Sequence, residues 1–143
     1  MRADENKAIV RRFIEQAFNE GNLAAIDELV ASDYVIHVAR TEVRGHNAVR
    51  KFVTMYRTAF PDYHCTIDDQ VAEGDKVVTR WTASGTQRGE LAEIPPTGKH
   101  MTLPGVAVDR IANGKLVETW LQADMLGMMQ QLGVIPAPEQ ASA

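Results

Sequence analysis

The spacing of the apolar residues changes at Pro61, and this change constrains the fold more than any other feature of the sequence. Before Pro61, apolar residues recur every three or four positions, which is typical of a helix with one buried face. After it, apolar and polar residues alternate, which is typical of a strand. Helices followed by antiparallel strands indicate an α+β fold. A chain of 143 residues has the usual length of one domain.

The helical half is predicted to contain three helices and one short strand. The helices cover residues 5–20, a short segment that Asn22 can cap, and residues 46–60, and the strand covers residues 34–38. The second half is predicted to contain four strands and a last short helix, at 63–71, 76–83, 101–111, 115–123 and 124–132. The domain is expected to span residues 1–134. Residues 135–143, rich in Pro and Ala, are expected to form a flexible tail.

Composition narrows the classes of function. The net charge of −4 argues against nucleic acid or a membrane surface as the partner, because neither polyanion attracts an acidic protein. The N-terminus has no apolar region of a signal peptide, and no apolar stretch approaches the roughly 20 residues of a membrane span. The single cysteine, Cys65, excludes an internal disulfide and suits a reducing compartment. We therefore expect a cytoplasmic protein.

A hairpin turn at Asn113-Gly114 predicts which side chains share a face of the sheet. A two-residue turn pairs Ala112 with Lys115 and fixes the register of both strands. The pairs that follow on one face are Asp109 with Glu118, Ala107 with Trp120, Gly105 with Gln122, and Leu103 with Asp124. This face is charged near the turn and carries small or apolar residues around Asp124, which predicts a ligand pocket with one carboxylate.

Asp124 is the candidate acid/base residue. In such a pocket its carboxylate should lose hydration, and its pKa should rise towards the range that is useful for proton transfer. The alternative is that Asp124 caps the last helix, since it stands directly before Met125 and Asp is a favoured capping residue. Both roles can hold together.

No motif points to a metal or a cofactor. The four histidines lack the spacing of a metal site, and dinucleotide and phosphate-binding fingerprints are missing from the sequence. This leaves acid/base chemistry without a cofactor, or plain binding. His37 can be a structural residue or a pocket residue, and Trp81 can belong to the core or to the pocket. Tyr56 lies on the apolar side of its helix, where its hydroxyl can serve as a donor in the pocket.

Several short motifs, taken together, resemble one family. They are Ala59-Phe60-Pro61-Asp62, Glu73-Gly74-Asp75 with Arg80-Trp81, Gly85-Thr86, Ile94-Pro95-Pro96-Thr97-Gly98-Lys99, Arg110-Ile111 with Gly114-Lys115, and Trp120 to Asp124 followed by Gln131-Leu132-Gly133. With these motifs the chain, from its first helix to about Gly133, resembles the SnoaL-like polyketide cyclases, or ester cyclases, of the nuclear transport factor 2-like superfamily.

The resemblance implies a cone-shaped, barrel-like α+β fold in which three N-terminal helices pack on a strongly curved mixed sheet and enclose one pocket. It also implies ring closure of an aromatic polyketide by intramolecular aldol condensation without cofactor or metal. The family's acid/base aspartate falls on Asp124. Two family histidines are replaced here, by Ala107 and by Gln87, so the reaction itself is left open.

The leading hypothesis is a cofactor-independent enzyme that acts on a small, mostly apolar carbonyl compound, with Asp124 as the acid/base. The pocket is expected to be lined by His37, Tyr56, Trp81, Gln87, His100, Leu103, Ala107, Trp120, Gln122 and Met128. The alternatives are a ketosteroid isomerase-like or epoxide hydrolase-like enzyme, a non-catalytic module that binds a hydrophobic ligand, and a structural dimer with a residual pocket. The apolar outer face of the hairpin predicts a homodimer, or a tetramer.

Overall fold

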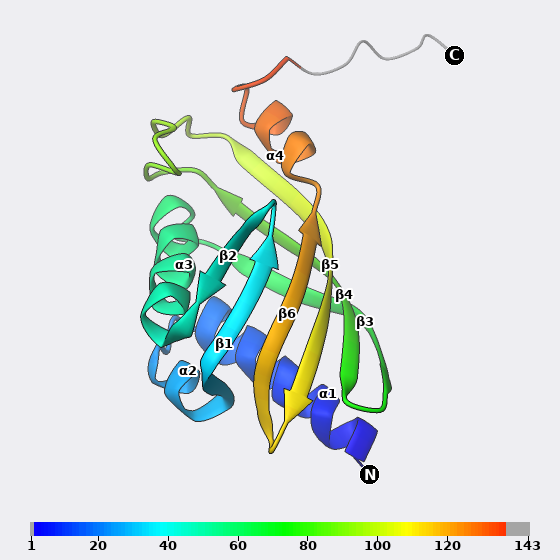
Figure 1. Cartoon of the computed structure of the whole chain (residues 1–143). Helices are drawn as coiled ribbons and strands as arrows, with labels where there is room; N and C mark the ends of the chain where they lie inside the picture. Colours follow the sequence, from blue (N-terminus) through cyan, green and yellow to red (C-terminus); the bar gives the residue numbers. More distant parts are fainter. Residues whose placement is uncertain (1, 137–143) are drawn as a thin grey trace, which may run out of the picture.

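The computed structural model describes residues 2–136 and has its helices mainly in the first half of the chain (Figure 1). The first helix, α1 (Arg2–Arg12), continues directly into a π-helix, η1 (Phe13–Asn19). Two further helices precede the long strands, α2 (Ala24–Leu29) and α3 (Gly45–Ala59), and α4 (Met125–Gln131) follows the last strand. The predicted helix 5–20 is therefore helical over most of its length but changes type at Phe13.

Within the described residues, six strands form one mixed sheet with the order β2-β1-β6-β5-β4-β3. Their bounds are β1 (Val30–Val38), β2 (Thr41–Arg44), β3 (His64–Glu73), β4 (Lys76–Thr86), β5 (His100–Ala112) and β6 (Lys115–Ala123). Strands β1 and β6 are parallel and every other neighbouring pair is antiparallel. The α+β class and the curved mixed sheet are as predicted, but the sheet does not close into a barrel and β2 was not predicted.

The helices gather on the concave side of the sheet (Figure 1). Helix α1 runs behind the strands, α3 lies beside β1 and β2, and α4 sits at the end of β5 and β6. The opposite face of the long strands carries no helix in the described part of the chain.

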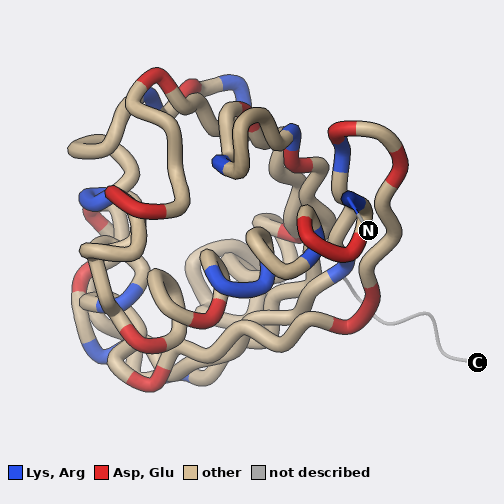
Figure 2. The backbone as a smooth tube through the Cα atoms, turned by 90° about the horizontal axis from the view of Figure 1, so that it is seen from below, with Lys and Arg blue, Asp and Glu red and all other residues tan. Residues whose placement is uncertain are grey.

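Lys and Arg positions are spread over the whole trace and lie among Asp and Glu positions (Figure 2).

Two groups of buried side chains form the core. The first lies between α1, α2, α3 and the β1–β6 part of the sheet, and includes Ile26, Tyr34 and Val53. The second lies between the end of α3, the strands β3 to β5 and α4, and includes Phe60 and Met128. The space between these two groups becomes the cavity described below.

The hairpin register departs from the prediction by one residue, because β6 contains a β-bulge. The turn pairs Ala112 with Lys115 as predicted, and Ile111 pairs with Leu116. The next pair is Arg110 with Glu118, so Val117 has no partner in β5. A one-residue shift moves every later side chain of the strand to the other face of the sheet. The predicted pairing of Ala107 with Trp120 is therefore wrong, and Ala107 pairs with Leu121 instead.

The predicted tail begins at Ile135, and its residues 137–143 lie outside the described part. None of the helices between residues 2 and 136 is long and apolar enough to cross a membrane.

Candidate active site

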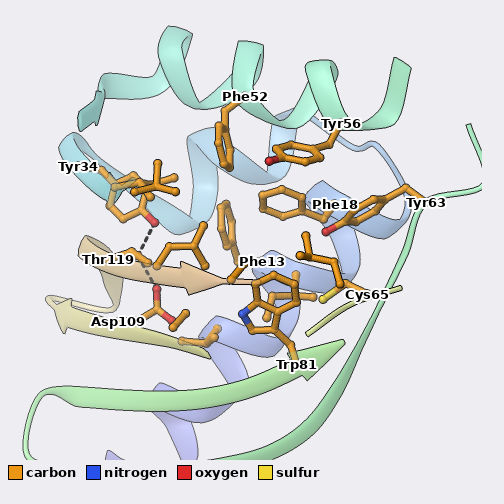
Figure 3. Close-up of a pocket in the computed structure, with 18 of the residues that line it drawn as sticks. Phe13, Phe18, Tyr34, Phe52, Tyr56, Tyr63, Cys65, Trp81, Asp109 and Thr119 are labelled. Carbon is orange, nitrogen blue, oxygen red and sulfur yellow. Dashed lines mark hydrogen bonds between the residues drawn. The ribbon is translucent and has the colours of Figure 1, made fainter. Parts of the chain in front are cut away.

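A mostly apolar cavity lies between the helices and the concave side of the sheet (Figure 3). Its free volume is about 90 Å³. Aromatic side chains from α3, η1 and the strands form much of its wall, namely Phe13, Phe18, Phe52, Tyr56, Tyr63 and Trp81. A concave, apolar site with few polar groups is the usual form of a small-molecule site.

One carboxyl group, that of Asp109, lines this cavity. Asp109 lies on β5, and only 4% of its surface is exposed. It pairs with Thr119 of the neighbouring strand β6, and the Thr119 hydroxyl donates a hydrogen bond to the Asp109 carboxylate. Thr119 also pairs with Ile36 of β1, which places Tyr34 nearby on the same strand. Three strands therefore position one polar group at the cavity wall.

The hydrogen bonds of this group form a chain that ends at the carboxylate. The hydroxyls of Tyr34 and Thr119 are 2.5 Å apart. Because Thr119 uses its only proton towards Asp109, Tyr34 is the donor to Thr119. Figure 3 shows the two bonds at one end of the cavity, leading from Tyr34 to Thr119 and from Thr119 to Asp109. The chain fixes the carboxylate and leaves its other oxygen sites for a ligand.

Burial changes the proton affinity of this group. It raises the pKa of Asp109 from its ordinary value of 3.8 to about 7, and the hydrogen bond from Thr119 acts in the opposite direction. Burial also raises the pKa of Tyr34 well above 10, so the phenol stays protonated. An acid with a pKa near 7 exists in both forms near neutral pH, which suits general acid/base catalysis.

A second set of polar atoms lies at the opposite end of the cavity (Figure 3). It comprises Tyr56 of α3, Tyr63 and Cys65. Burial raises the pKa of the Cys65 thiol to about 12, so it stays protonated and is a poor nucleophile. Burial also raises the pKa of Tyr56. These groups offer hydrogen bonds rather than charge.

The ring of Trp81 forms the wall between these two ends and lies against Gly105. A Cβ atom at Gly105 would come within 2.3 Å of Cζ2 of the indole. Trp81 and Gly105 are partners in the β4–β5 ladder. The missing side chain at Gly105 therefore gives the indole its place in the cavity wall.

Four of the predicted pocket residues line this cavity: Tyr56, Trp81, Leu103 and Ala107. Their contact with a substrate stays a prediction. Met128 is fully buried in the second core group and is not part of the cavity lining. Its neighbour Met125 lines the cavity instead.

Asp124, Trp120 and Gln122 do not line this cavity. Gln122 and Asp124 border a second pocket, which Trp81 and Gly105 also line. Their predicted roles towards a substrate stay predictions. The bulge at Val117 turns Trp120 and Gln122 to the outer face of the sheet, where Trp120 is 38% exposed. Asp124 is exposed and its carboxylate accepts a hydrogen bond from the Gly127 amide, with a distance of 2.9 Å between Oδ1 and N. It caps α4, which was the alternative considered from sequence.

His37 also lies on the outer face, next to Trp120. The two rings are stacked, with centroids 5.6 Å apart and an angle of 19° between them. His37 Nε2 lies 2.7 Å from Oε2 of Glu118. Its partners are therefore surface residues of β6, and it is not in the cavity lining.

Gln87 begins the long connection between β4 and β5, and His100 is the first residue of β5. Gln87 is fully buried, but it donates to the carbonyls of Gly89 and Ile94 and accepts from the Thr97 hydroxyl. It holds this connection together, and a buried polar group requires such partners. His100 is exposed, and its Nδ1 lies 3.2 Å from the Thr86 hydroxyl. Neither residue lines the cavity.

Asp109, Thr119 and Tyr34 were not proposed as site residues from sequence. A signal for Asp109 existed, because strand alternation places it on the same face as Ala107 and Leu103. A charged residue at the core side of a strand is unusual unless it is paired or functional. Thr119 could not be found, because the bulge that turns it inward leaves no clear mark in the sequence. No three His, Cys, Asp or Glu side chains among residues 2–136 lie close enough to hold a metal ion.

The chain is a small α+β protein with a curved mixed sheet and an apolar cavity. Comparisons with known proteins give its family. Residues 8–132 match the model of the SnoaL-like polyketide cyclase family, and the chain belongs to this family. It is 29% identical over 136 residues to the aklanonic acid methyl ester cyclase DnrD of Streptomyces peucetius, covering 92% of this chain and 93% of that protein.

Solved structures agree with this assignment. IdmH of Streptomyces antibioticus is 33% identical and superposes with a TM-score of 0.77, over 90% of this chain and 98% of that one. TsrD of Streptomyces laurentii is 30% identical with a TM-score of 0.83, over 92% of this chain and 97% of that one. The similarity therefore extends over nearly the whole described chain.

Proposed function

We propose that this protein is a cofactor-independent acid/base enzyme of the polyketide cyclase type, which acts on a small, mostly apolar carbonyl compound. The observation that carries the proposal is Asp109, a buried carboxyl with a pKa near 7 that faces an apolar cavity. The family and the name of the S. peucetius relative, a methyl ester cyclase, support ring closure as the outcome.

In the proposed reaction, the Asp109 carboxylate removes a proton from the carbon next to a substrate carbonyl. The C–H bond breaks, its electrons form an enolate, and the proton is held by Asp109. The enolate carbon then attacks a second carbonyl of the same substrate and forms the new C–C bond. The alkoxide that results takes a proton back from Asp109, so protons balance and no external oxidant or reductant is needed.

The surroundings of Asp109 support this cycle. Thr119 and Tyr34 hold the carboxylate in one orientation and remain protonated throughout. The apolar wall excludes water, which would otherwise protonate the enolate before it reaches the second carbonyl. The other cavity-lining residues of β5 and β6, which are Leu103, Ala107, Leu121 and Ala123, are apolar. Asp109 is therefore the group that we expect to move the proton.

Asp124 is the competing candidate, since the family resemblance assigns the acid/base aspartate to it. The two aspartates can be separated with a matched pair of variants, Asp109→Asn and Asp124→Asn. The measurement is hydrogen–deuterium exchange at the carbon next to the carbonyl of 1-indanone in D₂O, followed by NMR. This ketone is small, apolar and unable to close a ring, so exchange reports proton removal alone.

We expect Asp109→Asn to lower the protein-catalysed exchange rate about 100-fold or more, the usual contribution of a general base. Asp124→Asn should leave the rate within about threefold of wild type. Thermal unfolding of both variants checks that they are folded. An unchanged rate in Asp109→Asn, or an equal loss in Asp124→Asn, contradicts the assignment to Asp109.

The apolar cavity wall favours one second candidate, a binding module for a hydrophobic ligand. In that case wild type binds 1-indanone saturably but does not accelerate exchange above the buffer rate. Saturable binding of 1-indanone without faster exchange would support a binding module and contradict the proposed enzyme.

A further inference from the structure

Trp81 carries a hydrogen-bond donor for which none of the described residues, 2–136, is the acceptor. The side chain is only 7% exposed and lines the cavity. Among residues 2–136, its Nε1 donates no hydrogen bond. Every fully buried side-chain nitrogen or oxygen in this part of the chain has a hydrogen-bond partner. Nε1 must therefore border free space. Figure 3 shows this nitrogen on the side of the ring that faces Asp109.

Tyr56 carries a second such donor. Its hydroxyl makes no hydrogen bond with any other described residue and points into the cavity in Figure 3. Tyr63, in contrast, has its hydroxyl against the Cys65 thiol. The protons of Tyr34 and Thr119 are used in the chain to Asp109. The cavity thus offers two donors that no described residue uses, from Trp81 and Tyr56, beside the carboxylate of Asp109.

An unused donor in an apolar wall selects among ligands. A buried indole N–H normally has a partner, and leaving it without one costs free energy. A hydrocarbon cannot supply that partner, whereas a carbonyl oxygen can. The oxygen also gains negative charge when the neighbouring carbon loses a proton, and a fixed donor stabilises that charge more than it stabilises the neutral carbonyl.

We infer that Trp81 is a specificity-determining residue whose Nε1–H binds the carbonyl oxygen of the substrate, so that the site takes flat, apolar ring ketones in preference to hydrocarbons of the same shape. The inference rests on the proposed function for the carbonyl and for Asp109 as the base. Tyr56 is the donor available to a second oxygen of the same ligand. Neither residue needs to change its protonation state.

The test compares 1-indanone with indane, which have the same ring system and differ in the carbonyl. Dissociation constants of both are measured by NMR titration for wild type, Trp81→Phe and Trp120→Phe. The ratio of the two constants cancels the effect of cavity size, because both ligands gain or lose the same packing. Trp120 is the matched control, since it is the other tryptophan and lies on the outer face.

We expect the ratio of the indanone constant to the indane constant to rise about fivefold in Trp81→Phe, the effect of one neutral hydrogen bond. Trp120→Phe should leave it unchanged. An unchanged ratio in Trp81→Phe overturns the inference, and so does a wild type that binds neither ligand. Because binding does not require proton transfer, a protein that fails the exchange test of the proposed function can still show this ratio, so the two failures are distinguishable.

A spectroscopic measurement gives a second, direct readout. In Trp120→Phe, Trp81 is the only tryptophan, so its indole N–H gives a single ¹⁵N–¹H resonance. Saturating 1-indanone should move its proton downfield, whereas indane should not. Equal shifts with the two ligands would show that Nε1 does not meet the carbonyl and would also overturn the inference.

Discussion

The hydroxyl of Thr119 donates a hydrogen bond to the Asp109 carboxylate, where β5 and β6 pair inside the cavity. This bond favours the charged form and so lowers the pKa of Asp109 against the effect of burial. Thr119→Val keeps the shape and removes the donor. We expect the pH profile of indanone exchange to move to higher pH and the rate at pH 6 to fall roughly fivefold.

A matched control is available for this change. Thr82 donates a hydrogen bond of 2.7 Å to Asp68, a Thr–Asp pair outside the cavity. Thr82→Val should leave the pH profile where it is. A profile that does not move in Thr119→Val, or moves equally in both variants, would show that Asp109 is not the titrating base.

Asp109 should make the folded protein less stable as the pH rises. Its pKa is about 7 when folded and near 3.9 when unfolded, so between these values the folded state binds more protons. Stability from this group is therefore full below pH 4 and falls until about pH 7. Because Asp109 is deeply buried, we expect the free energy of unfolding of Asp109→Asn to exceed that of wild type by up to about 4 kcal/mol at pH 8.

The measurement is urea unfolding of both proteins from pH 4 to pH 8. Near pH 4 the two should differ by less than about 1 kcal/mol in free energy of unfolding, since Asp109 is then protonated in the folded state and about half protonated in the unfolded state. A difference that stays constant over this range would mean that burial does not raise the pKa of Asp109.

Asp124 should matter for stability through its capping bond. Its carboxylate accepts from the Gly127 amide at the start of α4. Asp124→Ala removes this cap and should lower the free energy of unfolding by about 1 kcal/mol, whereas Asn can still cap. Chemical denaturation of the two variants distinguishes them. Equal stability of Asp124→Ala and wild type would argue against a capping role.

The outer face of the sheet should mediate the predicted self-association. Val71, Val106 and Trp120 are exposed there, on strands that no helix among the described residues covers. Val106→Asp places a charge on this face and should convert a homodimer into a monomer in sedimentation velocity runs. Val134→Asp is the control, because Val134 is 45% exposed, close to the 42% of Val106, but follows α4. A monomeric wild type would refute the homodimer prediction.

The sequence predicted the fold well where its periodicity was plain. The four long strands and α3 agree with the prediction to within about three residues, because each has a regular alternation or a helical stripe. Residues Thr41–Arg44 were missed as a strand, since four residues are too few to show a period.

The residues of the site were predicted less well, because one β-bulge changed the register of β6. A single unpaired residue, Val117, reverses the faces of the rest of β6. A turn motif fixes only the pairs next to it, so the error began two pairs beyond Asn113-Gly114. Gln87 was misplaced for another reason, since its partners belong to an irregular connection whose path the sequence does not indicate.

The π-helix at Phe13–Asn19 decides which aromatic rings form the cavity wall. In a π-helix, residues five apart share a face. Accordingly Phe13 and Phe18 meet edge to face, with centroids 5.6 Å apart, and both line the cavity. An α-helix aligns residues three or four apart instead. If this segment wound as an α-helix of the same length, residues five apart would no longer share a face and one of the two rings would turn away from the cavity. The extra residue in the π-helical turn therefore decides which rings form the cavity wall, without altering any strand.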